Sequence, residues 1–480
     1  MHKSLFLLAA TFGLSACALG PDYQRPDLVL PTRYPHAVQP STSAGTPATS
    51  QHGAPQAISA RWWSAYQDAQ LDQLIEQALA HNTDIAQAAA RIEQSAALDQ
   101  QARGAQLPSV NGSGAATRSR SSLTTASPGN GVANDLQWAA STAFELDFWG
   151  RLRRASEATR AQTLASRYAQ EVVQQTVASQ TAQYYFAWQA SNRQVAFTRH
   201  TLESYQAELP LQQSRLQHGT ISQLDLEQTE DALAATQQQL QEQLRQRDLQ
   251  VNQLTLLCGR FSLALSERSG SDQPATQLAP IPTPPSGLPA DLLARRPDVR
   301  QAEQSLIAAN ARIGVAEAAR LPSLTLTGQG RSESAGLPDL LHDPSRIWSL
   351  GVGLYLPLFD GGRRAAAVVQ AKATWAEALA AYRGAALSAF KDVADALANQ
   401  QAANTAHQQA QTREQLAEHS LALTRQRYAA GSSGYSELLG AQRALDSARA
   451  RQLTSQTDQL DASIALFKAL GGGWQAPAQG

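Results

Sequence analysis

The feature that most constrains this chain of 480 residues is an internal duplication. A helical stretch that opens near residue 82 and closes at a Leu-Pro-Ser triplet recurs without a gap in the second half. Matching positions, 212 to 214 residues apart, are Asp84 and Asp298, Pro108 and Pro322, Arg215 and Arg427, and Gly219 and Gly431. Length alone predicts about three domains. The duplication predicts instead two copies of one structural unit.

The two copies are separated by a proline-rich connector. Six prolines between residues 274 and 289 exclude a helix there, because proline lacks the backbone N–H and clashes with the preceding turn. The expected boundaries are a signal peptide at 1–16, an extended lipid-anchored segment at 17–60, a first repeat at 61–258, the connector at 259–290, a second repeat at 291–470 and a tail at 471–480.

Within each copy the hydrophobic period switches from helix to strand and back. Apolar and polar or small residues alternate over 136–148 and again over 348–358. Weaker strands at about 108–120 and 322–332 precede them, which predicts β-hairpins at about 108–148 and 322–359. Strands of a soluble sandwich usually have about five or six residues. These are longer, which favours the wall of a transmembrane barrel, with apolar side chains outward and polar ones inward.

Long helices are predicted on either side of the hairpins. Residues 151 to about 209 and 364 to about 430 contain no proline, and about sixty helical residues would reach roughly 90 Å. Apolar positions follow a coiled-coil seam, while the other faces carry Gln, Ala and Ser more than charge. A solvated helical hairpin is one interpretation. A wall of packed neighbouring helices fits the small and amide residues better.

Composition limits the partners and the assembly. The net charge of −1 argues against general affinity for nucleic acid. No apolar run after residue 16 approaches the roughly 18 residues of a spanning helix. Four strands per chain would leave two open edges in lipid, where unpaired backbone groups are costly. Closed barrels need about eight strands or more, so several chains must contribute, in a number that these patterns leave open.

The N-terminus reads as an export signal. A basic start and an apolar stretch at 5–14 are followed by Leu14-Ser15-Ala16-Cys17. This tetrapeptide resembles the bacterial lipobox, in which Cys17 is acylated and becomes the first mature residue; an ordinary signal peptide is the alternative. Ala18, where inner-membrane lipoproteins carry Asp, points by the same resemblance to the outer membrane. Cys258 would then have no disulfide partner.

Several segments together resemble the TolC-type outer membrane efflux proteins, specifically their NodT-like lipoprotein branch. They are residues 17–23, Trp62-Trp63 with the helix at 72–79, Arg295-Arg296-Pro297-Asp298-Val299, residues 321–325 and Phe359-Asp360-Gly361-Gly362-Arg363. The resemblance covers nearly the whole mature chain. It implies an α+β membrane protein: a homotrimer whose twelve-stranded outer-membrane β-barrel, four strands per chain, continues into a periplasmic α-helical barrel with an equatorial domain.

The same resemblance implies a function and partners. The trimer would be the passive exit duct of a tripartite efflux pump for drugs or other toxic small molecules. Its partners would be a periplasmic adaptor (membrane fusion protein), an inner-membrane transporter of the resistance-nodulation-division type and outer-membrane lipid. It would be lipid-anchored in a Gram-negative bacterium and extend into the periplasm. The substrate itself is not implied.

The two helix-to-helix turns are the first candidate sites. The resemblance places Arg215 and Gly219, and Arg427 and Gly431, at the periplasmic tip, where the family docks its adaptor. Glycine also simply ends helices, because it accepts the left-handed conformation. Both interpretations can hold together.

Acidic residues are the second group of candidates. Asp225 and Glu437 match positions where the family rings its closed end with carboxylates, although Gln228 and Gly440 stand where relatives carry Asp. Charge at a helix N-terminus is the alternative. Glu145 is expected on the lumen face of the barrel together with Asp147, or else in periplasmic packing.

Nothing in the sequence predicts catalysis, a cofactor or a metal site. The nine histidines are scattered, and neither a phosphate loop nor a nucleophile elbow is present. The rival functions are a duct for protein secretion and a structural coiled-coil envelope lipoprotein. The alternating hairpins disfavour the second rival, because a scaffold has no need of lipid-facing strands.

Overall fold

The computed structural model describes residues 18–28, 31, 59–120, 132–265 and 295–472. The residues that are not described include Cys17, most of the 17–60 segment, most of the 259–290 connector and most of the C-terminal tail. The chain divides into two compact units. The first comprises 1–28, 90–167 and 301–384, and the second comprises 29–89, 168–300 and 385–480. Four helices run from one unit into the other.

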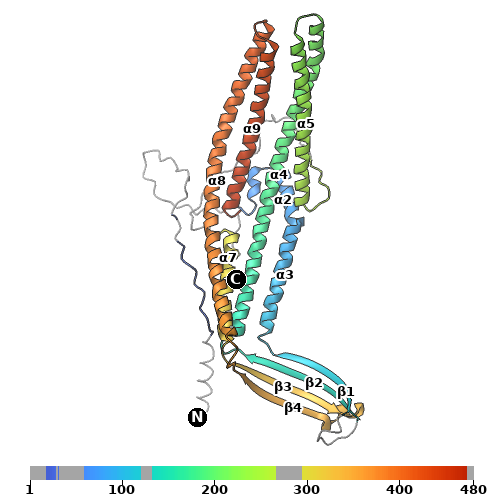
Figure 1. Ribbon diagram of the computed structural model, residues 1–480, viewed down its shortest axis with the longest axis vertical. Helices are drawn as coiled ribbons and strands as arrows, with labels where there is room; N and C mark the ends of the chain where they lie inside the picture. Colours follow the sequence, from blue (N-terminus) through green and yellow to red (C-terminus); the bar gives the residue numbers. More distant parts are fainter. Residues whose placement is uncertain (1–17, 29–30, 32–58, 121–131, 266–294, 473–480) are drawn as a thin grey trace. The chain divides into compact units, whose positions relative to one another are not determined.

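Both copies of the repeat contain the same elements in the same order (Figure 1). The first copy contains α3 (Thr83–Gly104), β1 (Ser109–Arg120), β2 (Val132–Leu146), α4 (Arg151–Gln217) and α5 (Gln223–Leu257). The second contains α7 (Pro297–Ala318), β3 (Ser323–Ser334), β4 (Arg346–Tyr355), α8 (Arg363–Ala429) and α9 (Tyr435–Ala469). The paired helices have equal lengths of 22, 67 and 35 residues. The predicted duplication is therefore confirmed.

The first unit contains a single antiparallel sheet in the order β1-β2-β3-β4 (Figure 1). Each copy contributes one hairpin, and β2 pairs with β3 across the two copies. Two short 3-10 helices, η2 (Leu337–Leu341) and η3 (Asp343–Ser345), connect β3 to β4. The predicted pair of hairpins is confirmed, and the register joins them into one four-stranded sheet.

Two strand ends differ from the prediction. β4 ends at Tyr355 and does not reach residue 358, because Pro357 has no N–H to donate to the ladder. β2 ends at Leu146, and Phe148 lies in the turn that leads into α4. There Gly150 has a φ of 75°, a left-handed conformation that glycine adopts without strain.

Helix α4 continues beyond its predicted end near residue 209 and includes Pro210. An internal proline costs about 3 kcal/mol, because one backbone hydrogen bond is lost. The helical turns after Pro210 are held by side-chain contacts: Gln212 is fully buried, and Arg215 bonds to the α8 residue Tyr428. Among the described residues, none of the helices has an apolar stretch sufficient to cross a membrane.

The second unit has an aromatic core around η1 (Trp62–Tyr66) and α2 (Ala69–His81). Trp62 stacks on Phe467 of α9 with ring centroids 5.3 Å apart, and Tyr66 lies 5.2 Å from Phe186 of α4. Asp68 caps α2 by accepting the backbone N–H groups of residues 70 and 71. The core thus joins the segment before the first repeat to helices from both copies.

Candidate functional site

The register gives the sheet two chemically different faces. Residues directly opposite each other in antiparallel strands point to the same side. One face is apolar and carries Leu136, Trp138, Phe144, Leu146, Leu324, Leu326, Trp348, Leu350, Val352 and Leu354. The other carries polar and small residues: Gln137, Ser141, Glu145, Thr325, Thr327, Gln329, Ser349, Gly351 and Gly353.

Both edges of the sheet are open within one chain. β1 and β4 each pair on one side only, so the other side of each presents unpaired backbone groups in the described chain. The apolar side chains of β4 are also uncovered: Trp348 is 77% exposed and Leu350 is 79% exposed. If such a sheet lies in lipid, its open edges must be paired within a larger closed structure, because no water is available to the unpaired backbone groups.

The junction between β2 and α4 contains the two candidate lumen acids. Glu145 lies on the polar face, and its carboxylate forms two hydrogen bonds with Arg151, at 3.0 and 2.7 Å. Asp147 lies beyond the strand, so its predicted place on the barrel wall is corrected. Its carboxylate accepts the backbone N–H groups of Leu152 and Arg153, at 3.0 and 2.9 Å. Asp147 therefore caps α4.

The two helix-to-helix turns have the same backbone geometry. Gly219 has a φ of 69° and Gly431 a φ of 72°. The residue after each glycine donates its N–H to the carbonyl of Arg215 or Arg427, at 3.0 and 2.9 Å. These bonds close both helices in the manner of a Schellman motif. A Cβ built on either glycine would meet no atom within 4 Å, so both turns are open to a partner.

The candidate gate acids lie in the first turns of their helices. Asp225 forms a capping box with Ser222, the residue before α5. Glu437 accepts a hydrogen bond from Arg427 at 2.8 Å and another from the hydroxyl of Ser433 at 2.6 Å. Both carboxylates therefore stabilise the turns; Glu437 is exposed, whereas Asp225 is partly buried.

The tips of the two hairpins are joined by side chains that sequence reasoning missed. The guanidinium of Arg215 donates to the hydroxyl of Tyr428 at 2.7 Å, and Thr229 donates to the hydroxyl of Tyr435 at 3.1 Å. Burial raises the pKa of Tyr435 above its ordinary value, so its hydroxyl stays protonated. The duplication contained a signal for both tyrosines, because their counterparts 212 positions earlier are Leu216 and Gln223.

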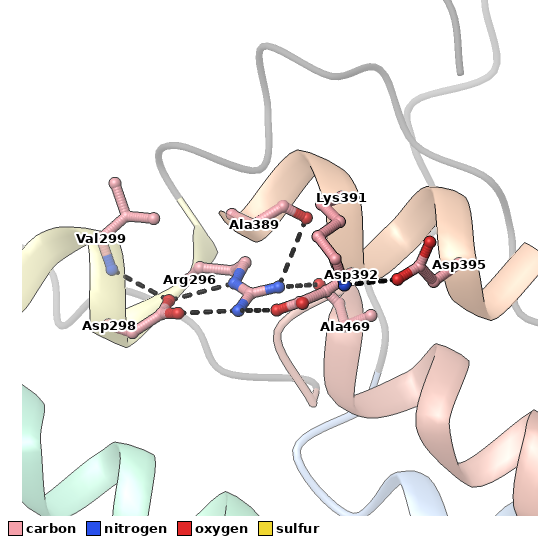
Figure 2. A network of polar contacts seen from close by, with 8 residues as sticks. All are labelled: Arg296, Asp298, Val299, Ala389, Lys391, Asp392, Asp395 and Ala469. Atoms are coloured by element: carbon pink, nitrogen blue, oxygen red, sulfur yellow. Dashed lines mark hydrogen bonds and ion pairs between the residues drawn. The ribbon is translucent and has the colours of Figure 1, made fainter. Parts of the chain in front are cut away.

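Figure 2 shows a second buried polar network, centred on Arg296 of the predicted Arg-Pro-Asp motif. Its guanidinium donates to Asp298 at 2.7 Å, to Asp392 of α8 at 2.9 Å and to the carbonyl of Ala469 at 3.1 Å. Burial opposes its charge, but hydrogen bonds and attraction from the two carboxylates outweigh burial and raise the pKa of Arg296. One side chain thus ties the start of α7 to α8 and to the end of α9.

The described residues contain no cluster of three or more His, Cys, Asp or Glu side chains that could hold a metal ion. Cys258 is a free, buried thiol, and burial raises its pKa, so it stays protonated and unreactive. His218, beside Gly219, is exposed and contacts the carbonyl of Ser214.

Comparison with known proteins connects this architecture to a family. The model of the outer membrane efflux protein family matches residues 74–260 and 288–472, which correspond to the two copies of the repeat. The toluene efflux pump outer membrane protein TtgF of Pseudomonas putida is 34% identical over 480 residues, covering 99% of this chain and 98% of the relative. The cation efflux system protein CusC of Escherichia coli is 32% identical over 482 residues, covering 98% and 99%.

A solved structure has the same fold. The open-state MtrE outer membrane channel of Neisseria gonorrhoeae superimposes with a TM-score of 0.82 at 26% identity, covering 97% of this chain and all of that one. The predicted family, the α+β fold with four strands and long helices, and the role as the outer-membrane part of an efflux system are confirmed. The chain belongs to the outer membrane efflux protein family.

Proposed function

We propose that three copies of the chain form a passive exit duct through the outer membrane. The observation that carries this proposal is the two-faced sheet with two open edges. Three such sheets close a barrel of twelve strands, and no backbone edge is then left in lipid. The apolar face meets the acyl chains and the polar face lines a water-filled bore, which eight strands would be too few to leave open.

The helices of both repeats, 61–258 and 291–470, form the periplasmic continuation of the duct. Relatives named for toluene and cation efflux support small toxic solutes as the cargo. The duct performs no chemistry, and an inner-membrane transporter of the resistance-nodulation-division type drives the flow. The wide exposure of the hairpin tips supports adaptor docking at Gly219 and Gly431, where nothing covers the turns.

Lipid anchoring at Cys17 is the remaining part of the proposal. The lipobox at 14–17 supports it. Intact-mass measurement of the purified protein should give the mass of a chain that starts at Cys17 and carries acyl groups. A Cys17→Ser variant is the control and should lack them. A wild-type chain without acyl groups would contradict the anchor, while the duct proposal would stand.

Cross-linking between copies tests the duct. In a Cys258→Ala background, one tagged chain carries Ser113→Cys or Asn111→Cys in β1, and a second carries Gly351→Cys or Gly353→Cys in β4. All four positions lie on the polar face. At least one pair should form an inter-chain disulfide in outer-membrane extracts, and the purified trimer should conduct ions in planar bilayers.

The matched control uses Leu350→Cys in β4, which points to the apolar face. It should not cross-link to β1 residues of the polar face, because adjacent strands present side chains of one face to each other. A protein that is purified as a water-soluble monomer, without cross-links or conductance, would refute the duct.

A further inference from the structure

The chain immediately after Cys17 is bound along helices of the first unit. The N–H of Leu19 donates to the carbonyl of Trp149 at 3.0 Å, and its carbonyl accepts from Arg154 at 3.2 Å. Arg154 also reaches the carbonyl of Gly20 at 3.4 Å, and Asn310 of α7 donates to the carbonyl of Pro21 at 2.7 Å. Three consecutive carbonyls are thus occupied by buried side chains, as a stably placed extended segment requires.

Two glycines allow the segment to lie this close to α7. A Cβ on Gly20, which has a φ of 93°, would lie 2.5 Å from the Cα of Gly314. A Cβ on Gly314 would lie 2.5 Å from the carbonyl oxygen of Leu19. Real Cβ atoms do not approach backbone atoms this closely, so a side chain at either position would displace the segment.

The far end of the segment is held by charge. The guanidinium of Arg25 lies 3.2 Å from the carboxylate of Glu303 in α7, whose side chain is only 7% exposed. Arg25 also donates to the hydroxyl of Tyr382 in α8 at 3.3 Å, and Tyr23 donates to Glu303 at 3.4 Å. A buried carboxylate needs such partners, because an uncompensated charge in the interior is strongly destabilising.

The side chains that hold this segment, which we call the groove, each occur in one copy of the repeat and not at the matching position of the other, within the described residues. The helices repeat at offsets of 212 and 214, so each contact residue has a counterpart in the other copy. The contact residues and their counterparts are Arg154 and Ala366, Asn310 and Ala96, Gly314 and Gln100, Glu303 and Ala89, and Tyr382 and Gln170. Three of the counterparts are alanines without a polar side chain, Gln100 would fill the space that Gly314 leaves open, and Gln170 lacks the hydroxyl of Tyr382. The positions that break the repeat therefore converge on one segment.

We propose that residues 19–25 are an intramolecular ligand of this groove, and that the groove fixes where the lipid-modified Cys17 enters the membrane. This inference rests on the proposed lipid anchoring. Ala18 lies against Gly150, since a Cβ on Gly150 would be 2.9 Å from the Cα of Ala18. Cys17 is one residue away, so its Cα lies within about 3.8 Å of that of Ala18.

The groove thus places the acyl chains at the end of β2, the level at which the apolar face of the sheet begins. A segment held in this way follows a fixed path along the helices, unlike a flexible tether. It also links α4 of the first copy to α7 and α8 of the second, through Arg154, Asn310 and Tyr382.

Hydrogen exchange of the purified full-length protein tests the proposal. In the wild type, the amide of Leu19, whose N–H donates to the carbonyl of Trp149, should exchange at least about tenfold more slowly than in a free peptide of the same sequence. Gly314→Ala should abolish this protection, because the new Cβ displaces Leu19. The matched control is Gly384→Ala in α8, where a Cβ meets no atom within 4 Å, and protection should persist. Both changes place alanine in a helix, which by itself is stabilising.

A Cys17→Ser chain separates the groove from the anchor. If the groove binds residues 19–25 by itself, protection persists in this unacylated chain, whatever the mass of the wild type reveals about acylation. A free-peptide exchange rate at Leu19 in the wild type would overturn the proposal. Unchanged protection in Gly314→Ala would overturn it equally, since the steric argument would then be wrong.

Discussion

Two buried arginines act as connectors between distant parts of the chain. Arg154 is 6% exposed and Arg296 is 9% exposed, and each donates to backbone carbonyls of another element as well as to carboxylates. The planar guanidinium has five donors in a fixed fork, so one side chain can hold several acceptors at once. Lysine at either position would keep the charge and lose this geometry.

Asp461 on α9 predicts a pH dependence of stability. Its Oδ1 is buried and has no hydrogen-bond partner in the described structure. Burial, and then the nearby Asp458, raise the pKa of Asp461 to about 6 from 3.8. The protonated form is therefore favoured in the folded chain. Its stabilisation is complete below about pH 4 and is lost as the pH rises through about 6.

Asp461→Asn keeps the shape of the side chain without its charge. We expect it to raise the free energy of unfolding by up to about 3 kcal/mol at pH 7.5 and to change little at pH 4. Denaturant unfolding at both pH values measures this. The control is Asp458→Asn on the exposed side of the helix, which should have a smaller effect. An equal effect of Asp461→Asn at both pH values would contradict the assignment.

Glu437 tests whether the tip carboxylates control ion flow. Glu437→Gln keeps hydrogen-bonding groups near Ser433 but removes the charge, so cation block in single-channel recordings should weaken. Stability should change by less than about 1 kcal/mol, because the ion pair with Arg427 is exposed. Glu242→Gln, an exposed change on a different helix, α5, is the control. Unchanged conductance and cation block in Glu437→Gln would rule out the gate.

At the scale of elements, the helix-to-helix turns tolerate less change than the long helices that they connect. Helix α4 tolerates Pro210 in its interior, because the turns on both sides are held by packing. The tip turns are held by hydrogen bonds more than by packing. Their geometry depends on one left-handed glycine each, and on bonds back to Arg215 and Arg427.

Gly431→Ala should therefore act on the tip and leave the rest of the fold intact. Alanine at a φ of 72° is strained by about 1–2 kcal/mol, so the turn should open or shift. We expect weaker adaptor binding in a pull-down assay and loss of efflux in cells, with normal trimer yield. Gly384→Ala, within α8, should keep both activities. Normal adaptor binding by Gly431→Ala would argue against docking at this turn.

At the scale of the whole molecule, duplication and its exceptions have different roles. Positions that agree between the copies give the equal helices and the paired hairpins. Positions that differ build features needed once per chain. These are the groove around Arg154 and Gly314, and the tyrosine contacts of Tyr428 and Tyr435 at the tips.

The orientation of the sheet in the membrane can be tested with neighbouring residues. Leu350→Arg would place a charge on the apolar face, at a cost of about 2–4 kcal/mol near the bilayer midplane. The yield of heat-modifiable trimer in outer membranes should fall. Ser349→Arg, one residue earlier on the polar face, should assemble normally and change ion selectivity. Normal assembly of Leu350→Arg, together with failed assembly of Ser349→Arg, would mean that the two faces are the reverse of those proposed.

Local patterns made much of the fold predictable. The alternation that defines β2 and β4, and the glycines at 219 and 431, act within a few residues of the chain. The ends of the strands do not follow the pattern as closely, because Pro357 ends β4 before the apolar alternation itself stops. Asp147 was misplaced for a similar reason: it continues the alternating pattern, but it is used to cap a helix.

The sequence by itself determined the duplication, the two-faced strands and the glycine turns between the long helices, because each of these is periodic or depends on close neighbours. Only the tertiary structure decided which side chains meet over long separations. Asn310 holds Pro21 across 289 positions, and Arg154 holds Asp22 across 132. Such contacts depend on how helices from both copies pack, and no local pattern encodes that packing. The positions that break the repeat are far apart in the sequence, and only the fold brings them together.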